Sequence, residues 1–343
     1  MSCLIIAEAG VNHNGSEELA LALVAAAAAT GADVVKFQTF SAKRLVRPGA
    51  PKAAYQERET GGGDQYSMLR ALELPEEAYP RLQQSCREYG IEFMSTPFDR
   101  EAADLLINLG MRRLKIPSGE ITNLPFLRNL AERGLPLILS SGMSTLTEVA
   151  EAVAAIRCTW KDKGIKETPS MLTLLHCTSN YPTAMEDVNL RAMQTMADHF
   201  GVAVGYSDHT AGVEVPVAAV ALGAKVIEKH FTLDHQLPGP DHKASLEPEE
   251  FTRMVREIRH IELALGNGVK EPKPTELPVR ELVRRSVTLL HPLAAGSVLQ
   301  PMDVDLLRPG TGIPPKSLEA TYGKVLSRDL PAGTTLTWDD LLP

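Results

Sequence analysis

Two histidines are the clearest candidates for binding a metal ion. His209 and His230 each follow a short apolar run of β-strand character, in AVGYSDHT and KVIEKHFT. If these strands are neighbours, the two imidazoles converge, an arrangement that suits a divalent transition metal such as Mn²⁺ or Zn²⁺. Asp208 and Glu228 would then orient the rings from behind. The alternative is a pair of structural histidines held by hydrogen bonds.

Two lysines lie within apolar runs and predict an anion site. Lys36 belongs to DVVKFQTF and Lys115 to RLKIPSGE. A buried ammonium group is costly unless it meets an anion or a hydrogen-bond acceptor. Together with the hydroxyl groups of Thr96, Ser118 and Ser140, the two lysines favour a pocket for phosphate or carboxylate. Lysine also serves as a Schiff-base nucleophile in barrel aldolases, and this alternative stays open.

Three carboxylates lie at comparable positions. Glu8 lies near the end of the first apolar run, CLIIAEAG, and Glu120 is the last residue of RLKIPSGE. Asp241 lies in the loop sequence LPGPD. Each can act as a general base or accept a hydrogen bond from a sugar hydroxyl, and each taken alone also fits a surface charge. Cys177 lies at a strand end too, where a cysteine is more often buried packing than a nucleophile.

Eight apolar runs must position these side chains. Each is followed by a stretch of helical pattern and ends in polar residues: CLIIAEAG, DVVKFQTF, EFMSTPF, RLKIPSGE, PLILSSGM, LTLLHCTS, AVGYSDHT and KVIEKHFT. This alternation predicts an α/β fold of the (β/α)8 TIM-barrel type, whose active site lies at the carboxyl ends of its strands. Polar ends on all eight runs indicate one convergent site, so an enzyme is the first hypothesis.

The helices between the runs have recognisable starts and lengths. Ser16 followed by two glutamates is typical of a capped helix start, and predicts a helix from Ser16 to Thr30. Segment 41–74 is long for a connection and predicts a lid or part of the rim of the site. Further helices are expected from near Pro75 and over Arg100–Leu109, Leu124–Arg133, Thr145–Arg157, Leu190–His199, Val213–Leu222 and Pro248–Leu265.

The texture of the sequence divides the chain into two domains. We expect a barrel over residues 1–265, a linker over 266–285, and a small mostly-β domain over 286–343. The three prolines within 266–278 predict that this part of the linker is extended. The last domain contains two similar phrases, LAAGSVLQPMDV and LPAGTTLTWDDL, each combining an apolar start, a glycine turn and an acidic end.

Charge and composition exclude several classes of function. The net charge is −8 without any cluster of Lys and Arg, which argues against nucleic acid and anionic membranes as partners. Anionic small molecules stay possible because a few basic side chains can make a local pocket. No signal peptide is expected, and the apolar stretch Leu19–Thr30 is too short to span a bilayer. Four cysteines without CxxC spacing fit a reduced, cytoplasmic location.

These motifs together resemble the bacterial sialic acid synthases, also called nonulosonic acid synthases. The resemblance runs from AEAGVNHNG through KFQTF, STPF, KIPSGE, LSSGM, HCTSNYP, YSDHT, EKHF and PGPD to LRPGTG, and so covers nearly the whole chain. The C-terminal segment resembles the antifreeze-like (SAF, β-clip) domain that this family carries. Each motif is short, and the combination is what makes the resemblance specific.

The resemblance implies a metal-dependent condensation. Family members join phosphoenolpyruvate to the open-chain aldehyde of an N-acetylated hexosamine and release phosphate by C–O cleavage. The implied cofactor is Mn²⁺, with Mg²⁺ or Co²⁺ as alternatives. The simplest activity is that of an N-acetylneuraminate synthase acting on N-acetylmannosamine. The alternatives are an N,N'-diacetyllegionaminic acid synthase acting on 2,4-diacetamido-2,4,6-trideoxymannose and, more remotely, a non-catalytic carbohydrate-binding protein.

The resemblance also assigns roles to residues of this chain. Lys36 and Lys115 would be catalytic. Glu120, at the end of RLKIPSGE, is our own candidate for the base that activates water. The metal ligands would be His209 and His230. Phosphoenolpyruvate would be held by Lys36, Thr96, Lys115, Ser118, Ser140, Ser179, Tyr181 and Ser207. The sugar would be held by Glu8, Gln38, Tyr181, Asp241 and Arg308.

Two of these assignments need a comment. Arg308, in LRPGTG, would come from the partner subunit, so the resemblance implies a domain-swapped homodimer. Ser179 stands where some family members have asparagine, and its hydroxyl can still donate to a phosphate oxygen.

Overall fold

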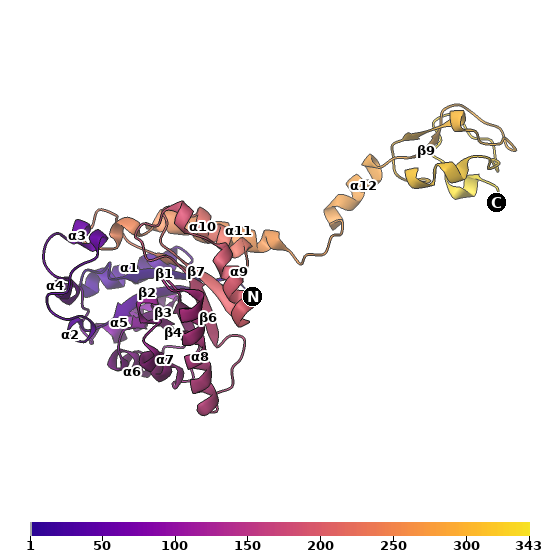
Figure 1. Ribbon diagram of the computed structural model, residues 1–343. Helices are drawn as coiled ribbons and strands as arrows, with labels where there is room; N and C mark the ends of the chain where they lie inside the picture. Colours follow the sequence, from indigo (N-terminus) through magenta and orange to yellow (C-terminus); the bar gives the residue numbers. More distant parts are fainter. Residues whose placement is uncertain (1) are drawn as a thin grey trace. The chain divides into compact units, whose positions relative to one another are not determined.

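The computed structural model describes residues 2–343, and the chain divides into two compact units between Gly266 and Asn267. The first unit contains eight parallel strands. They are β1 (Leu4–Gly10), β2 (Val34–Thr39), β3 (Glu92–Pro97), β4 (Leu114–Ile116), β5 (Leu137–Ser140), β6 (Leu172–His176), β7 (Ala203–Asp208) and β8 (Val226–His230). Their order in the sheet is β3-β2-β1-β8-β7-β6-β5-β4, and each coincides with one of the eight apolar runs. The predicted barrel is therefore confirmed (Figure 1).

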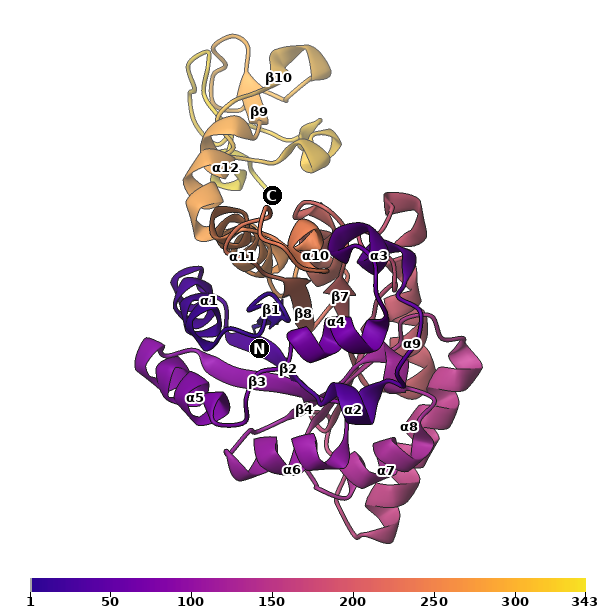
Figure 2. The same ribbon diagram turned by 90° about the vertical axis from the view of Figure 1, so that its left-hand side faces the viewer.

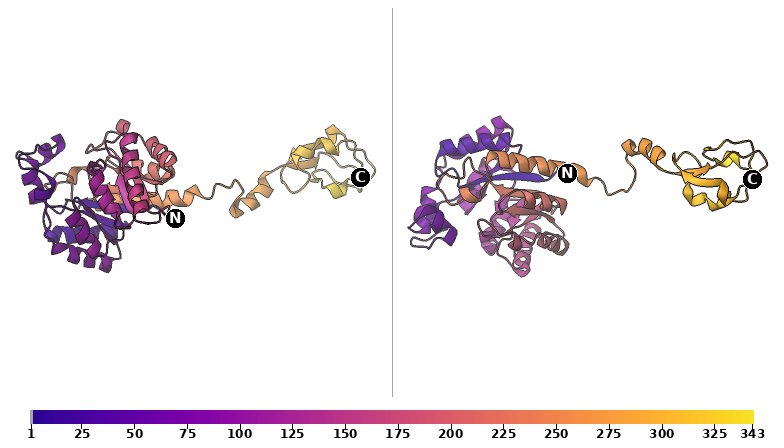
Figure 3. Two further views of the ribbon diagram at one scale, coloured as in Figure 1. Left: turned by 60° about the horizontal axis from the view of Figure 1, so that its bottom comes forward. Right: turned by 90° about the horizontal axis from the view of Figure 1, so that it is seen from above.

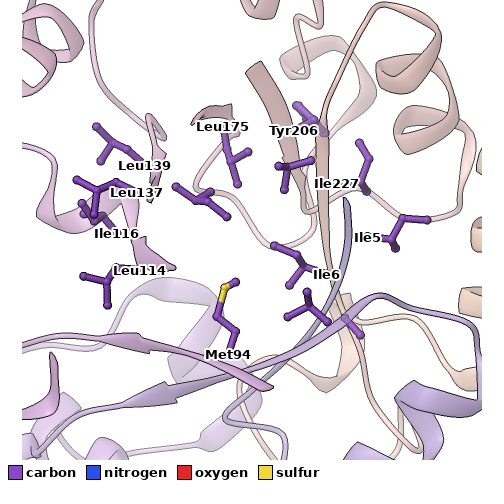
Figure 4. Close-up of a cluster of buried hydrophobic side chains, with 14 of the residues drawn as sticks. Ile5, Ile6, Met94, Leu114, Ile116, Leu137, Leu139, Leu175, Tyr206 and Ile227 are labelled. Atoms are coloured by element: carbon purple, nitrogen blue, oxygen red, sulfur yellow. The ribbon is translucent and has the colours of Figure 1, made fainter. Parts of the chain in front are cut away.

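The strands read as continuous apolar runs because both faces of each strand are buried. Side chains that point inward fill the barrel, and side chains that point outward pack under the helices. Figure 4 shows part of this core, to which nearly every strand contributes: Ile5, Ile6, Met94, Leu114, Ile116, Leu137, Leu139, Leu175, Tyr206 and Ile227. Because the interior is packed with apolar side chains, the polar side chains available for binding and catalysis lie at the carboxyl ends of the strands.

One long helix follows each strand and covers the outside of the barrel (Figure 2). These are α1 (Glu17–Ala29), α5 (Ala78–Tyr89), α6 (Arg100–Asn108), α7 (Leu124–Ala131), α8 (Leu146–Asp162), α9 (Arg191–Phe200), α10 (Glu214–Ala221) and α11 (Pro248–Leu265). The predicted cap is confirmed, because the Ser16 side chain accepts a hydrogen bond from the Leu19 amide. Helix α8 continues past its predicted end because Trp160 is buried and donates to the Ala131 carbonyl.

Segment 41–74 is built of three short helices rather than open loop. They are α2 (Ala42–Leu45), α3 (Ala54–Thr60) and α4 (Gln65–Ala71), gathered on one side of the barrel (Figure 1). Met68 and Leu72 pack with Val11 and Phe40 in a small hydrophobic cluster of their own. The segment is thereby attached to the loop that follows β1, close to the carboxyl ends of the strands.

The segment predicted as a linker, residues 266–285, is only partly extended. Residues 267–273 form no helix or strand, whereas a 3-10 turn, Pro274–Glu276, leads into α12 (Leu277–Val283). Two of the three prolines that suggested an extended chain, Pro274 and Pro278, fall in the first turns of these two elements. Proline is tolerated there because the first helical amides have no partner within the helix.

The remainder of the second unit is a small β domain (Figure 3). Strands β9 (Ser286–Leu289) and β10 (Val304–Leu307) pair antiparallel, and its core includes Leu299, Ile313 and Leu336. The two similar phrases adopt matching structures. Their first leucines, Leu293 and Leu330, pair in a β-bridge, and both phrases close on a 3-10 turn that is capped by an aspartate.

Across residues 2–343, no helix combines the length and the apolar character needed to cross a membrane.

Candidate functional site

The pleat of the last two strands decides which polar residues face the barrel interior. Successive side chains of a strand point to opposite faces, so Glu228 and His230 point inward while Lys229 points outward. On the paired position of β7, Asp208 also points outward and binds the Lys229 ammonium group, with both side chains fully buried. Asp208 therefore does not orient His209, and that prediction is wrong.

Glu228 lies among the lysines rather than behind the histidines. Its Oε1 atom lies 3.3 Å from Nζ of Lys115, its Oε2 atom lies 3.6 Å from Nζ of Lys36, and Ser207 donates to it at 3.0 Å. Burial favours the neutral acid, but the two ammonium groups outweigh it and lower the pKa of Glu228 to about 2. The carboxylate thus stays ionised and holds both lysines in the pocket, a role that differs from the predicted one.

Lys36 is held on three sides by residues from β1, β3 and β8. It forms an ion pair with Glu8 and donates to Thr96 Oγ1 at 3.0 Å, and Gln38 donates to Glu8 at 3.1 Å. Although burial disfavours its charge, Glu228 and Glu8 raise the pKa of Lys36. A Schiff-base lysine has to lose its proton, so this environment disfavours that alternative for Lys36.

Three hydroxyl-bearing loops meet beside the lysines. Gly142, with φ +48°, approaches so closely that a Cβ atom added there would lie 2.6 Å from Ser118 Oγ and 3.0 Å from Ser179 Oγ. The Oγ atoms of Ser179 and Ser140 are buried, and neither has a hydrogen-bond partner among the described residues. Buried hydroxyl groups are rarely left without a partner, so these two are free to bind an anionic ligand.

Cys177 lies next to this group but is not activated. The Gly142 amide donates to its sulfur at 3.2 Å, and burial raises the pKa of the thiol. All four cysteines are free, and Cys177 stays a thiol at neutral pH, as its expected packing role requires.

The two histidines lie side by side, with ring centroids 5.4 Å apart. Nδ1 of His209 faces the Thr178 carbonyl, so this nitrogen carries the proton and Nε2 keeps its lone pair. Nδ1 of His230 is buried without a hydrogen-bond partner in residues 2–343 and lies 3.8 Å from Asp241 Oδ2. Burial lowers the pKa of both rings, that of His209 to about 4, so both are neutral and able to bind a metal ion.

This donor set fits a divalent ion that keeps open positions. No group of three or more His, Cys, Asp or Glu side chains in the described chain is arranged to enclose a metal. An ion bound by the two imidazoles would take its remaining ligands from water or substrate.

Two tyrosines complete the wall around the histidines. The ring centroid of Tyr181 lies 4.1 Å from that of His209 and 5.5 Å from that of His230. Tyr55, from α3, stacks on Tyr181 at 5.1 Å with an interplanar angle of 30°. Segment 41–74 thus forms part of the rim, as predicted. The sequence analysis did not identify Tyr55, because the sequence of a long connection does not indicate which of its side chains point toward the site.

Two predicted residues are not part of the cluster described so far. Glu120 ends the 3-10 turn Ser118–Glu120, which directs its carboxylate toward α7, where Asn123 donates to it at 2.7 Å. Arg308 belongs to the second unit and is exposed. The other predicted residues come together from several strand ends: Glu8, Lys36, Gln38, Thr96, Lys115, Ser207 and His230 in one group, with Ser118, Ser140, Ser179, Tyr181, His209 and Asp241 around it.

Known proteins match this chain over most of its length. The N,N'-diacetyllegionaminic acid synthase of Legionella pneumophila is 53% identical over 342 residues, which cover 99% of this chain and 95% of the relative. The synthase of the same name from Campylobacter jejuni is 45% identical, with coverages of 95% and 96%. The crystal structure of N-acetylneuraminic acid synthetase from Leptospira borgpetersenii, in complex with citrate, superposes with a TM-score of 0.70 at 34% identity over 81% of this chain and 90% of that one.

Family models agree with both units. The SAF domain model matches residues 284–342 and confirms the antifreeze-like domain, and the NeuB family model matches residues 23–270. Because its relatives are synthases of legionaminic and sialic acids, the chain is an enzyme of the nonulosonic acid synthase class. It belongs to the NeuB family and carries a C-terminal SAF domain.

Proposed function

We propose that this enzyme joins phosphoenolpyruvate to 2,4-diacetamido-2,4,6-trideoxymannose, forming N,N'-diacetyllegionaminic acid and phosphate with the uptake of one water. The observation that carries the choice of sugar is the identity of 53% and 45% to two N,N'-diacetyllegionaminic acid synthases, against 34% to an N-acetylneuraminic acid synthetase. The comparisons thus favour the legionaminic alternative over the simpler expectation of an N-acetylneuraminate synthase.

The anion site supports phosphoenolpyruvate as the donor substrate. Lys36 and Lys115 place two buried positive charges beside the free hydroxyls of Ser140 and Ser179. Glu8 and Glu228 balance these charges before the substrate arrives, so the hydroxyl groups and Lys115, which has only one carboxylate partner, are the groups most available to an anion. Charge-assisted hydrogen bonds of this kind hold phosphate and carboxylate groups in a dry pocket.

The histidine pair supports binding of the sugar aldehyde. A divalent ion held by His209 and His230, Mn²⁺ in our proposal, would draw electron density from the carbonyl group of the substrate. Asp241 and Tyr181 adjoin the pair and face the space in which the rest of the sugar would lie. Glu8 and Gln38 contact each other next to that space and offer an acceptor and a donor for sugar hydroxyls.

The proposed reaction follows from these positions. The alkene carbon C3 of phosphoenolpyruvate attacks the aldehyde carbon and forms the new C–C bond. The carbonyl π electrons move to the aldehyde oxygen, which takes up a proton, and positive charge is left at C2. The buried carboxylates of Glu8 and Glu228 stabilise that charge electrostatically. Water then adds to C2 and loses one proton to Glu120, which balances the proton taken up by the aldehyde oxygen. The C–O bond to phosphate breaks, and the second proton of the water leaves with the phosphate to give the 2-keto acid. In this scheme Glu120 must exchange its bond with Asn123 for one with water.

A sugar-panel assay tests the proposal. Purified enzyme is incubated with phosphoenolpyruvate, with Mn²⁺ or with a chelator, and with either the diacetamido sugar or N-acetylmannosamine, while released phosphate is measured. We expect the fastest release with the diacetamido sugar and Mn²⁺. Faster release with N-acetylmannosamine would assign the enzyme to sialic acid synthesis, and no release with any hexosamine would favour the carbohydrate-binding alternative.

We also propose that the enzyme works as a cytoplasmic homodimer. An exposed Arg308 on the SAF domain is suited to reach the acetamido carbonyl of a sugar bound by the partner subunit, because guanidinium groups donate readily to such oxygens.

A further inference from the structure

A groove beside the site takes no part in the reaction as proposed. Its volume is about 520 Å³, within the range of small-molecule sites. One wall is formed by α3, α4 and the glycines between them, and the other by the loop Pro238–Pro240 that follows β8.

Both walls of the groove continue into the site. Helix α3 contributes Glu59 and Thr60 to the groove, and the same helix carries Tyr55, which stacks on Tyr181. On the other wall Pro240 lines the groove, and the next residue, Asp241, lies 3.8 Å from the His230 ring. A molecule bound at the histidines and extending past the tyrosines is therefore directed toward this groove.

The charged side chains of the groove are already satisfied. Lys52 donates to Thr60 Oγ1 at 2.9 Å and to the carbonyls of two glycines, and Glu59 forms an ion pair with Lys243. Asp64 accepts hydrogen bonds from the Ser67 amide and from one further backbone amide. These pairings leave little unbalanced charge for a ligand, so the groove suits a neutral group better than an anion or a cation.

The rest of the lining combines apolar and polar groups on a small scale. Met68, Leu72, Pro238 and Pro240 provide apolar surface, and the exposed Ser67 adds a hydroxyl group. An acetamido substituent matches such a surface, because its methyl group can contact the apolar side chains while its amide forms hydrogen bonds with the polar groups.

We propose that this groove is the subsite for the end of the acceptor sugar remote from its aldehyde, where the sugar carries a 4-acetamido group and a 6-methyl group. The inference rests on the proposed function and deepens it: the α3–α4 wall and the Pro238–Pro240 loop select the diacetamido sugar over N-acetylmannosamine, which has hydroxyl groups at both positions.

Filling the groove tests this subsite. Ser67 lines the groove from α4, whereas Arg70, on the same helix and exposed, does not line it. Ser67→Phe should lower kcat/KM for the diacetamido sugar by about tenfold or more, the scale on which pocket contacts discriminate substrates. The same variant should lower kcat/KM for N-acetylmannosamine by less than about threefold, and Arg70→Phe should alter neither value. Thermal unfolding of both variants verifies that the fold is kept.

The outcomes separate the two proposals. Wild-type enzyme that fails to use the diacetamido sugar overturns the proposed function and the subsite with it. The subsite alone is overturned if the wild-type enzyme uses this sugar but Ser67→Phe lowers kcat/KM equally for both acceptors or for neither. If Ser67→Phe does not fold, Ser67→Leu replaces it, with Arg70→Leu as its control.

Discussion

Glu228 Oε1 lies 3.3 Å from Nζ of Lys115, and this ion pair joins β8 to β4 across the interior of the barrel. The same carboxylate also faces Lys36. One buried anion therefore organises two cations that belong to different strands, and the anion site depends on it. This arrangement leads to the first prediction.

Glu228→Gln should destabilise the protein. The variant leaves two buried ammonium groups with a single carboxylate, and breaking a buried ion pair costs about 3–5 kcal/mol in the free energy of unfolding. Chemical denaturation measures this loss. Glu257→Gln, which breaks an exposed pair with Arg253 on α11, is the control and should unfold nearly as the wild type does. Equal stabilities for the two variants would contradict the central role of Glu228.

His230→Ala should abolish metal-dependent turnover while the protein stays folded. The expected cause is the loss of one of only two imidazoles in the proposed ion site. Isothermal titration with Mn²⁺ should show at least tenfold weaker binding, consistent with the loss of a ligand. His235→Ala, on the loop after β8, should bind Mn²⁺ as the wild type does. Full activity of His230→Ala, with metal still required, would show that His230 is not a metal ligand.

Glu120→Gln should lower kcat by about 10²–10⁴-fold, the range that general acid–base catalysis contributes. The KM for phosphoenolpyruvate should change little, since Glu120 contacts none of the lysines or serines of the anion site in the described residues. Steady-state kinetics with phosphate detection measures both constants. Asn123→Ala, which frees the carboxylate, should retain activity. If Glu120→Gln kept the kcat of the wild type, Glu120 would not be the base, and Glu8 would be the next candidate.

Gly142→Ala should raise the KM for phosphoenolpyruvate. The new methyl group would lie 2.3 Å from Ser118 Cβ, and the residue would keep a φ of +48° that alanine disfavours. Ser118 and its neighbours must then move. Gly119→Ala is the matched control, because a Cβ atom at Gly119 would meet nothing within 4 Å. If both variants had wild-type kinetics, these loops would not form the phosphate site.

Arg308→Ala should raise the KM for the sugar far more than that for phosphoenolpyruvate. The reason is the proposed contact of its guanidinium group with the acetamido carbonyl of a sugar in the partner subunit. Mixing Arg308→Ala chains with Glu120→Gln chains should restore part of the activity, because half of the sites in a mixed dimer would then be complete. Equal increases in both KM values, or no complementation, would speak against a shared site.

The strands, the helices and most of the site could be predicted from the sequence because they depend on local pattern. Apolar runs such as LTLLH that alternate with stretches of helical pattern are typical of buried strands, and Ser16 before two glutamates is typical of a helix start. Parallel strands in a barrel bring their carboxyl ends to one face, so Lys36, Lys115, His209 and His230 had to share a site once the barrel was recognised.

Only the tertiary structure decided which groups meet within that site. Asp208 and Glu228 look equivalent in sequence, each near a histidine, yet the pleat turns Asp208 outward to Lys229 and Glu228 inward to the lysines. Tyr55 reaches Tyr181 through packing between distant segments, for which no local pattern exists. Residue type and strand position are properties of the chain, whereas ion pairing and stacking depend on distances that arise only when the barrel closes.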